Sequence, residues 1–297
     1  MRIIILGANG QLGKSLKKIF QKTNYKFYFF NKHNLDINDH ITLNKKFISI
    51  KPDIIINCCA YTAVDKAEKN YEEANNVNNV AVGKLAQQCM KYNCFLIHIS
   101  TDYVFDGLSQ NPYVENDKKN PIGVYGKTKL DGEYKILDSG CKFCIIRTSW
   151  IFSEFGNNFL KTILKLASKN DELSVISDQV GSPTYSGDIS QTILTILPLI
   201  KNRTIKNEIF HYSGNTFCSW YEFAKIIIEV AVEKNFLKKK PTLKSITTSQ
   251  YSALAKRPLN SSLSSEKIFT QVNIKPSDLK KNIENVITIL KKKYKKF

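Results

Sequence analysis

The first half of the chain alternates short apolar runs with amphipathic stretches. Such runs are typical of strands buried on both faces of a sheet, and they lie at residues 3–6, 27–30, 53–57, 94–100 and 143–148. Apolar side chains at helical spacing fill residues 12–20 and 71–92, and Pro121 precedes a further helical segment around Tyr125. This repeated alternation predicts an α/β protein with a doubly wound parallel sheet.

The second half is less regular and predicts a smaller C-terminal lobe. Helical spacing covers residues 158–167, 188–197 and 220–232 and resumes near Ser277, whereas residues 173–176 and 209–212 are strand-like. Residues 237–263 are rich in Lys, Ser and Thr, which favours loops and short pieces. We therefore expect a large domain at residues 1–156 plus about 185–215, and a smaller α/β lobe at residues 157–184 and 216–297.

Composition is that of a globular protein with a substantial core. Of 297 residues, 42% are hydrophobic, and no run approaches the roughly 18 apolar residues that suggest a membrane span. The apolar run at the N-terminus is shorter than that of a secretory signal, so we expect a soluble cytoplasmic protein. The seven cysteines are an odd number, and Cys141 and Cys144 have no second zinc-type pair, so we expect buried, reduced thiols.

The formal net charge of +18 is large. Its densest runs are residues 238–240 and 291–296, but lysines are spread along most of the chain rather than gathered in one module. A basic balance suits nucleic acid or an anionic membrane. Without a recognisable binding motif, we expect a solvated surface and neither nucleic acid nor membrane as a partner. Salt-dependent DNA binding would reveal the alternative.

A glycine-rich turn, G-x-x-G-x-x-G, follows the first predicted strand and opens the first predicted helix. Gly7 allows a sharp exit from the strand, Gly10 lets backbone N–H groups approach a pyrophosphate, and Gly13 lets the helix pack closely. Phosphates then lie at the positive end of the helix. The strand before and the helix after the turn favour dinucleotide binding over an ordinary turn.

The end of the second strand bears on the choice of cofactor. An acidic residue that holds the adenosine ribose usually follows this strand, but here the sequence is Phe30-Asn31-Lys32-His33. Asn31 can bond a ribose hydroxyl, and Lys32 can face a 2′-phosphate. The missing acid favours NADPH and leaves NADH open.

Tyr125 and Lys129 are spaced to lie on one face of a helix, about one turn apart. A phenol has a pKa near 10, and a neighbouring ammonium lowers it. Ser100 and Thr101 follow a strand whose carboxyl end is where ligands bind in such sheets, so their hydroxyls can bond a substrate oxygen. Together these residues predict hydride transfer to or from a nicotinamide with proton transfer through Tyr125.

Further motifs run through most of the chain in a fixed order. They are residues 57–68 (NCCAYTAVDKAE), 100–107 (STDYVFDG), 147–150 (RTSW), 157–159 (NNF), 178–184 (DQVGSPT) and 256–261 (KRPLNS). With the glycine turn and the Tyr125–Lys129 pair, they make the chain resemble the extended short-chain dehydrogenase/reductase family. Within that family it is similar to the group that reduces dTDP-4-keto-6-deoxy sugars.

This resemblance implies a Rossmann domain that binds NAD(P) and a C-terminal lobe that binds a sugar nucleotide. It implies reduction of the C4 ketone of dTDP-4-dehydro-L-rhamnose to dTDP-L-rhamnose, the last step in supplying that sugar for cell-surface polysaccharide. The implied catalytic residues are Tyr125, Lys129 and Thr101. Tyr125 and Lys129 are also expected to contact the cofactor. The other expected cofactor contacts are Gly7, Gly10, Gln11, Leu12, Gly13, Asn31, Lys32, Asp36, Ile37, Ala60, Tyr61, Thr62 and Ile99. The expected substrate contacts are Thr101, Asp102, Trp150, Gln179 and Arg257, of which Arg257 suits a diphosphate.

Several alternatives stay open. Some members of the family hold magnesium between subunits with glutamates, but the first of these positions is Ser15 here, so we predict no metal and leave a homodimer open. A dehydratase or epimerase is the first rival, although Tyr103 stands where dehydratases carry an acid, and Gln11-Leu12 replaces their usual Phe-Ile. A reductase of another 4-keto-6-deoxy sugar and a non-catalytic NADP-binding regulatory subunit are the others.

Overall fold

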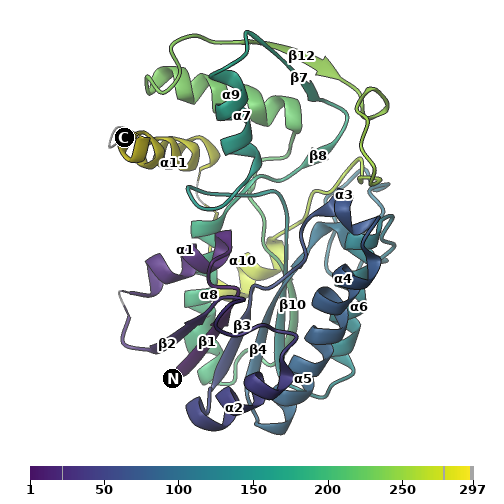
Figure 1. Ribbon diagram of the computed structural model, residues 1–297, viewed down its shortest axis with the longest axis vertical. Coiled ribbons are helices and arrows are strands. Elements are labelled where there is room, and N and C mark those ends of the chain that lie inside the picture. Colours follow the sequence, from purple (N-terminus) through teal and green to yellow (C-terminus); the bar gives the residue numbers. More distant parts are fainter. Residues whose placement is uncertain (22, 277, 295–297) are drawn as a thin grey trace.

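A six-stranded parallel sheet forms the centre of the computed structural model, which describes residues 1–21, 23–276 and 278–294 (Figure 1). The strand order is β10-β5-β4-β3-β1-β2. Their bounds are β1 Arg2–Leu6, β2 Lys26–Phe30, β3 Ile54–Asn57, β4 Phe95–Thr101, β5 Phe143–Thr148 and β10 Asn207–His211. Every neighbouring pair is parallel, which confirms the predicted sheet.

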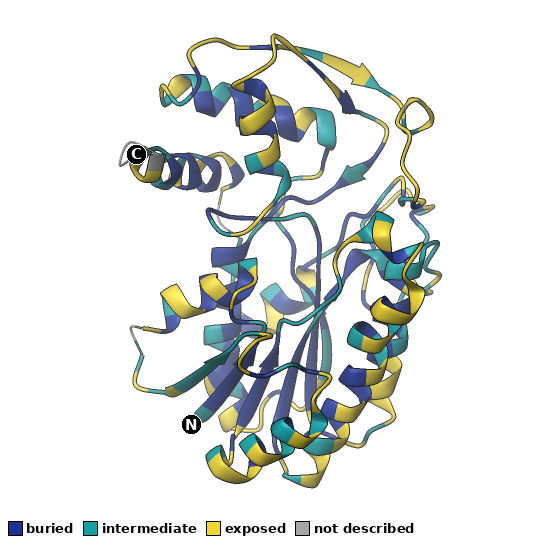
Figure 2. Ribbon diagram, in the orientation of Figure 1, coloured by how far each residue is buried: buried dark blue, intermediate teal, exposed yellow. Residues whose placement is uncertain are grey.

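Helices cover both faces of the sheet because its strands are apolar on both sides. In β1, Ile3 and Ile5 join one core, whereas Ile4 and Leu6 join another on the opposite face. The first core is closed by α1 (Gln11–Phe20), α8 (Ser186–Lys201) and α10 (Glu266–Val272). The second is closed by α2 (His40–Ile50), α5 (Ala81–Lys91) and α6 (Val124–Leu137), and Figure 2 shows the buried strands between these layers.

The long helix predicted at residues 71–92 is interrupted. It consists of α4 (Tyr71–Asn75), a π-helical turn η1 (Asn76–Val80) and then α5. At the π turn, the buried Asn78 side chain accepts a hydrogen bond from Tyr61 N (2.8 Å) and donates to Tyr61 O (3.2 Å) and Thr128 Oγ1 (3.1 Å). The turn therefore fixes the segment after β3 and the helix α6 relative to each other, as π turns do near functional sites.

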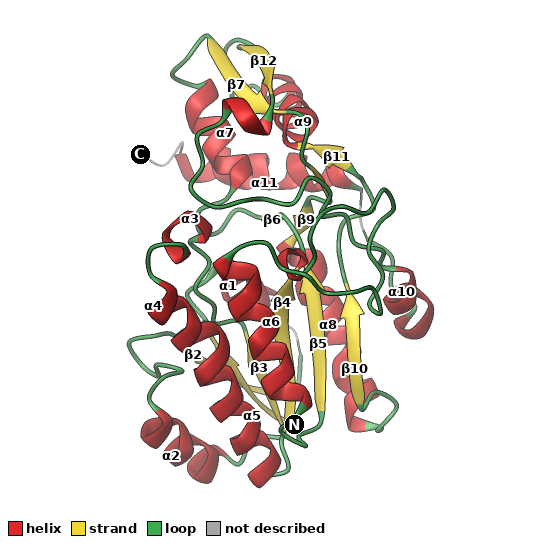
Figure 3. Ribbon diagram, turned by 90° about the vertical axis from the view of Figure 1, so that its right-hand side faces the viewer, coloured by secondary structure: helices red, strands yellow, loops and turns green. Residues whose placement is uncertain are grey.

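A separate apolar core lies in the upper part of the molecule (Figure 3). It packs α7 (Phe159–Ala167), α9 (Trp220–Glu233) and α11 (Leu279–Tyr294) beside the parallel pair β7 (Glu172–Ile176) and β12 (Thr242–Ile246). Strand β12 lies in the stretch predicted to be loops and short pieces, and most of its side chains are exposed. Ser277, where the last helix was expected to begin, lies outside the described residues.

The remaining elements are short. They are α3 Val64–Ala67, η2 Asp102–Val104, β6 Ile151–Phe152, β8 Val180–Gly181, β9 Thr184–Tyr185, β11 Cys218–Ser219 and η3 Thr248–Gln250. All seven cysteines are free, and Cys141 and Cys144 are buried, as predicted. Within the described part of the chain, no helix is long and apolar enough to cross a membrane.

Candidate active site

A cavity of about 620 Å³ opens at the carboxyl ends of the central strands. This is the edge at which parallel α/β sheets bind ligands. The predicted site residues that line it are Gly10, Gln11, Leu12, Ala60, Thr62, Ile99, Thr101, Asp102, Tyr125, Lys129 and Trp150. The structure therefore brings the phosphate turn, the three predicted catalytic residues and two predicted substrate contacts around one space.

The glycine turn fits a dinucleotide phosphate. Gly7 has a φ of +79°, and a Cβ on Gly13 would lie 2.4 Å from Gly7 O, so side chains are excluded at both positions. Helix α1 begins after Gly10 with no side-chain cap, which leaves the N–H groups of its first turn available to an anion.

A second cavity of about 280 Å³ continues from the first, with which it shares Gly10 and Ala60. Besides these two, six of its lining residues are predicted cofactor contacts: Gly7, Asn31, Lys32, Asp36, Ile37 and Tyr61. Asn31 Oδ1 accepts hydrogen bonds from His33 N and Asn34 N. Lys32 is exposed and also lines this cavity. Glu73 of α4 also lines it and was missed, because no local motif marks a carboxylate so far from the turn.

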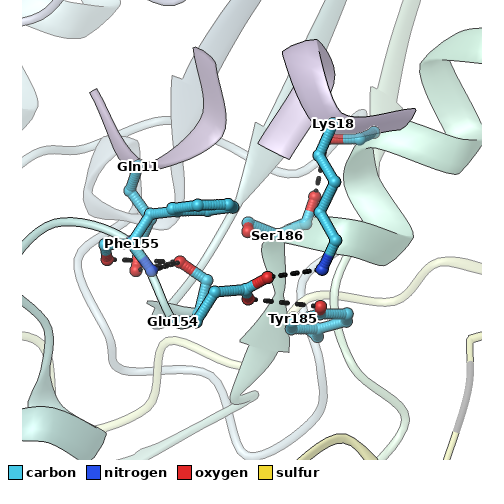
Figure 4. A network of polar contacts seen from close by, with 8 residues as sticks. Gln11, Lys18, Glu154, Phe155, Tyr185 and Ser186 are labelled. Carbon is cyan, nitrogen blue, oxygen red and sulfur yellow. Dashed lines mark hydrogen bonds and ion pairs between the residues drawn. The ribbon is translucent and has the colours of Figure 1, made fainter. Parts of the chain in front are cut away.

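The Gln11 side chain is hydrogen-bonded to the segment that follows β5. Its Oε1 accepts from Ser153 Oγ (2.9 Å) and Asn158 Nδ2 (2.6 Å), and its Nε2 donates to Ile151 O (3.1 Å). Beside it, Glu154 accepts hydrogen bonds from Lys18 Nζ of α1 at 2.7 Å and from the Tyr185 hydroxyl at 3.3 Å (Figure 4). Helix α1 and the segment after β5 are thus bonded to each other through the Gln11 side chain and the Lys18–Glu154 pair.

Tyr125, Thr101 and Asp102 line the cavity next to one another. Thr101 Oγ1 donates to Asp102 Oδ1 at 2.8 Å, and both residues are buried at the end of β4. Asp102 Oδ2 is buried and has no hydrogen-bond partner of good geometry within the described residues. Burial raises the pKa of Asp102 to about 6, against the lowering effect of the Thr101 and Ser261 hydroxyls. A buried, unpaired carboxylate oxygen suits a substrate hydroxyl.

Burial raises the pKa of Tyr125 to about 12, a hydrogen bond with Thr101 opposes this rise, and the charge of Asp102 adds to it. The pKa of Tyr125 is therefore raised overall in the protein alone, whereas a lowered pKa was expected. The Lys129 ammonium is engaged elsewhere, since its Nζ is 2.7 Å from Ile99 O and 3.1 Å from His98 Nε2. A phenol with this pKa is protonated at neutral pH and is ready to donate.

The surroundings of Lys129 include two residues that sequence reasoning missed. Asn57 Oδ1 accepts from Cys59 N, so its Nδ2 donates to His98 Nδ1 at 3.1 Å, and the remaining ring hydrogen lies on Nε2, toward Lys129. That hydrogen favours a neutral amine. Burial acts in the same direction and lowers the pKa of Lys129 to about 8, whereas Glu133 raises it.

Glu133, one turn beyond Lys129 on α6, belongs to a buried ion pair. Arg147 of β5 donates to it through Nη2 (2.7 Å) and Nε (3.0 Å), and Ser100 Oγ donates at 2.5 Å. Both charged side chains are 1% exposed. The pair joins α6 to β5. Glu133 could have been predicted from the sequence, because it lies four residues after Lys129, as Lys129 lies four residues after Tyr125, and all three then share one face of the helix.

Two predicted substrate residues point elsewhere. Gln179 Nε2 donates to Thr248 Oγ1 at 3.0 Å, and Arg257 Nη2 donates to Asp65 Oδ2 at 2.6 Å. Neither lines the two cavities. Their substrate roles, like all the residue roles above, stay predictions. Within the described residues, no group of three or more His, Cys, Asp or Glu side chains is placed to hold a metal, and the absence of a metal likewise stays a prediction.

The fold and the site define a class: a dinucleotide-binding α/β oxidoreductase with a tyrosine–lysine pair beside its glycine turn. The chain belongs to the dTDP-4-dehydrorhamnose reductase family, since the family model described as the RmlD substrate binding domain matches residues 1–292. A curated dTDP-4-dehydrorhamnose reductase from Aggregatibacter actinomycetemcomitans is 42% identical over 96% of this chain and 98% of its own length.

Solved structures agree. A dTDP-4-dehydrorhamnose reductase from Clostridium acetobutylicum has a TM-score of 0.90 and 35% identity, covering 98% of this chain and 100% of the other. The enzyme from Bacillus anthracis in complex with NADP has a TM-score of 0.87 and 35% identity, covering 97% and 99%. A UDP-glucose 4-epimerase from Thermotoga maritima, covering 99% of this chain and 100% of its own, shares the fold alone, at 16% identity and a TM-score of 0.82.

Proposed function

We propose that this protein reduces the C4 ketone of dTDP-4-dehydro-L-rhamnose to dTDP-L-rhamnose with NADPH. The observation that carries the proposal is one cavity that contains the phosphate turn, Thr101, Tyr125, Lys129 and Trp150. The A. actinomycetemcomitans dTDP-4-dehydrorhamnose reductase, 42% identical, supports the substrate. A relative named for spore coat polysaccharide biosynthesis in Bacillus subtilis, 36% identical, supports a destination in surface polysaccharide.

The bound nicotinamide supplies the hydride, and the chain supplies the proton and the geometry. The glycine turn and the start of α1 hold the phosphates, and Asn31 and Lys32 hold the adenosine ribose. Thr101 Oγ1 bonds the C4 oxygen of the sugar. Asp102, through its unpaired oxygen, accepts a hydrogen bond from a sugar hydroxyl.

Tyr125 gives its phenolic proton to the C4 oxygen as negative charge develops there. Its raised pKa keeps the proton in place until that moment. Lys129 bonds the nicotinamide ribose and, when protonated, stabilises the phenolate that remains.

NADPH is the preferred cofactor in this proposal. Lys32 is an exposed cation at the edge of the cavity proposed for the adenosine, where a 2′-phosphate would lie, and the similar B. anthracis enzyme holds NADP. We also infer that the domain at residues 1–156 plus about 185–215 binds the cofactor and that residues 157–184 and 216–297 form the sugar-nucleotide lobe. A homodimer and a cytoplasmic location stay predictions.

The decisive experiment follows oxidation of NADPH and NADH with dTDP-4-dehydro-L-rhamnose, in the wild type and in Tyr125→Phe. We expect Tyr125→Phe to lower kcat by about 100-fold or more, because it removes the proton donor and leaves the ring in place. Tyr134→Phe, a tyrosine on the exposed face of the same helix, is the control and should keep full activity. No oxidation of either cofactor by the wild type would disprove the proposed reaction.

A further inference from the structure

The two tryptophans of the chain lie stacked on each other at the active site. Their ring centroids are 3.3 Å apart, and their planes differ by 6°. Trp150 comes from the segment between β5 and β6, whereas Trp220 is the first residue of α9, in the C-terminal lobe. Both line the 620 Å³ cavity. Stacks of this kind bury large apolar surfaces while leaving one edge or face for a ligand.

Several contacts fix the position of this tryptophan stack. Trp150 has a φ of +45°, which is unfavourable for a residue with a side chain. A Cβ on Gly181 would lie 2.3 Å from its indole, so the absence of a side chain at Gly181 makes room for the ring. Gly181 in β8 pairs with Cys218 in β11, and Trp220 follows directly after β11. The β8–β11 pair therefore sets both indoles at once.

Trp220 is also held by contacts within the C-terminal lobe. Its ring lies 4.5 Å from that of Phe159 in α7, and α9 is anchored just before it by the Ser219–Glu222 capping box. Of the described residues that line the cavity, Trp220 is the one that follows position 157. The C-terminal lobe thus reaches this cavity through its first residue, Asn157, and through the firmly held ring of Trp220.

We propose that Trp220 is a substrate-specificity residue, which with Trp150 forms the wall that contacts the apolar face of the 6-deoxy sugar. This inference rests on the proposed function. The tryptophan stack lines the same cavity as Thr101 and Tyr125, the residues proposed to contact the sugar C4 oxygen. A 6-deoxy sugar carries a methyl group in place of a hydroxymethyl group, and an indole face matches that apolar surface better than a polar side chain.

The test compares Trp220→Leu with Tyr221→Leu, which removes the next aromatic ring on α9, one that does not line the cavity. We expect Trp220→Leu to raise KM for dTDP-4-dehydro-L-rhamnose about tenfold, with kcat and the KM for NADPH within about twofold. Tyr221→Leu should change none of the three. Trp220→Phe, which keeps an aromatic face and is the milder change for folding, should raise KM less than Trp220→Leu does.

Two further readouts separate the sugar contact from other roles. Inhibition by dTDP, which lacks the sugar, should keep the same Ki in Trp220→Leu; a Ki that rises together with KM would overturn the sugar contact. Stacked indoles give an exciton couplet in far-ultraviolet circular dichroism, which the wild type should show and Trp220→Leu should lose. An active wild type without the couplet, or with KM unchanged in Trp220→Leu, would overturn this inference alone. An inactive wild type would overturn the proposed function and the inference together.

Discussion

Lys129 is a fully buried lysine whose ionisation falls near neutral pH. It is 1% exposed, and burial lowers its pKa to about 8, against the raising effects of Glu133 and the two thiols Cys58 and Cys59. The ring hydrogen on His98 Nε2 also favours its neutral form. Small changes of pH around neutrality should therefore change the fraction of the protein in which Lys129 is charged.

Because the ammonium is the form that stabilises a developing phenolate, kcat/KM should fall as pH rises through about 8, the pKa of Lys129. Tyr125, with its pKa near 12, does not titrate in this range. The measurement is the pH profile of kcat/KM at saturating NADPH. Lys129→Arg keeps its charge throughout, so its residual activity should lack this limb. A wild-type profile that stays flat across the pKa of the lysine would show that the charge is not needed.

Lys32 is the residue on which the preference for NADPH depends in our proposal. Replacing it with Gln removes one cation from an exposed site, so kcat/KM for NADPH should fall about tenfold while that for NADH changes little. Lys45→Gln, on the exposed side of α2, is the matched control. Equal losses with both cofactors would place Lys32 away from the 2′-phosphate.

At the scale of elements, helix α6 carries the predicted catalytic residues Tyr125 and Lys129 and is held to strand β5 by the buried Glu133–Arg147 pair. Removing one partner of such a pair leaves a buried charge without compensation. We expect Glu133→Gln to lower the free energy of unfolding by about 3–5 kcal/mol, measured by urea denaturation.

The control for this prediction is Glu229→Gln, which makes the same chemical change in an exposed pair with Lys240. It should cost less than about 1 kcal/mol, because solvent screens that pair. The double variant Glu133→Gln/Arg147→Met should recover part of the loss, since it removes both buried charges. Equal losses for Glu133→Gln and Glu229→Gln would mean that the buried pair adds nothing to stability.

Which elements were predictable follows from burial. Strands such as β1 and β5 contain runs of four apolar residues, Ile3 to Leu6 and Phe143 to Ile146, because both faces of the sheet are covered, so a short window of sequence identifies them. Strand β12 carries Thr, Lys and Ser on an exposed edge, and its pairing with β7 depends on tertiary contacts. The π turn at Asn78 was also missed, because its cause is a set of hydrogen bonds to Tyr61 and Thr128, which are distant in sequence.

The candidate site divides in the same way. Thr101, Tyr125 and Lys129 belong to local motifs, so the sequence was enough to bring them together. His98 and Trp220 reach the site only through the fold, since their neighbours Lys129 and Trp150 lie far away along the chain. Arg257 shows the opposite limit: its chemistry suits a diphosphate, but in the structure a carboxylate, Asp65, already holds it.

At the scale of the whole molecule, two cores meet around one cavity. The sheet and its helices form the larger core, and α7, α9 and α11 form the other. Gln11 bonds the segment that leads into α7, and the ion pair of Asp65 with Arg257 links α3 to the segment after β12. In the proposed division of roles, the cofactor contacts the first part and the sugar nucleotide contacts both.

Hydrogen exchange can test this division directly. We expect NADPH alone to slow amide exchange at residues 7–13 and 58–62, which form its proposed site, and to leave the first turn of α9 unchanged. Adding dTDP-L-rhamnose to the NADPH complex, in which both ligands are reduced and cannot react, should slow exchange at the start of α9, where Trp220 lines the cavity. The β7–β12 pair, which lines neither cavity, is the internal control and should exchange equally in all three states. If NADPH alone protected α9 as strongly as both ligands together, the cofactor would contact the C-terminal lobe and the proposed division would be wrong.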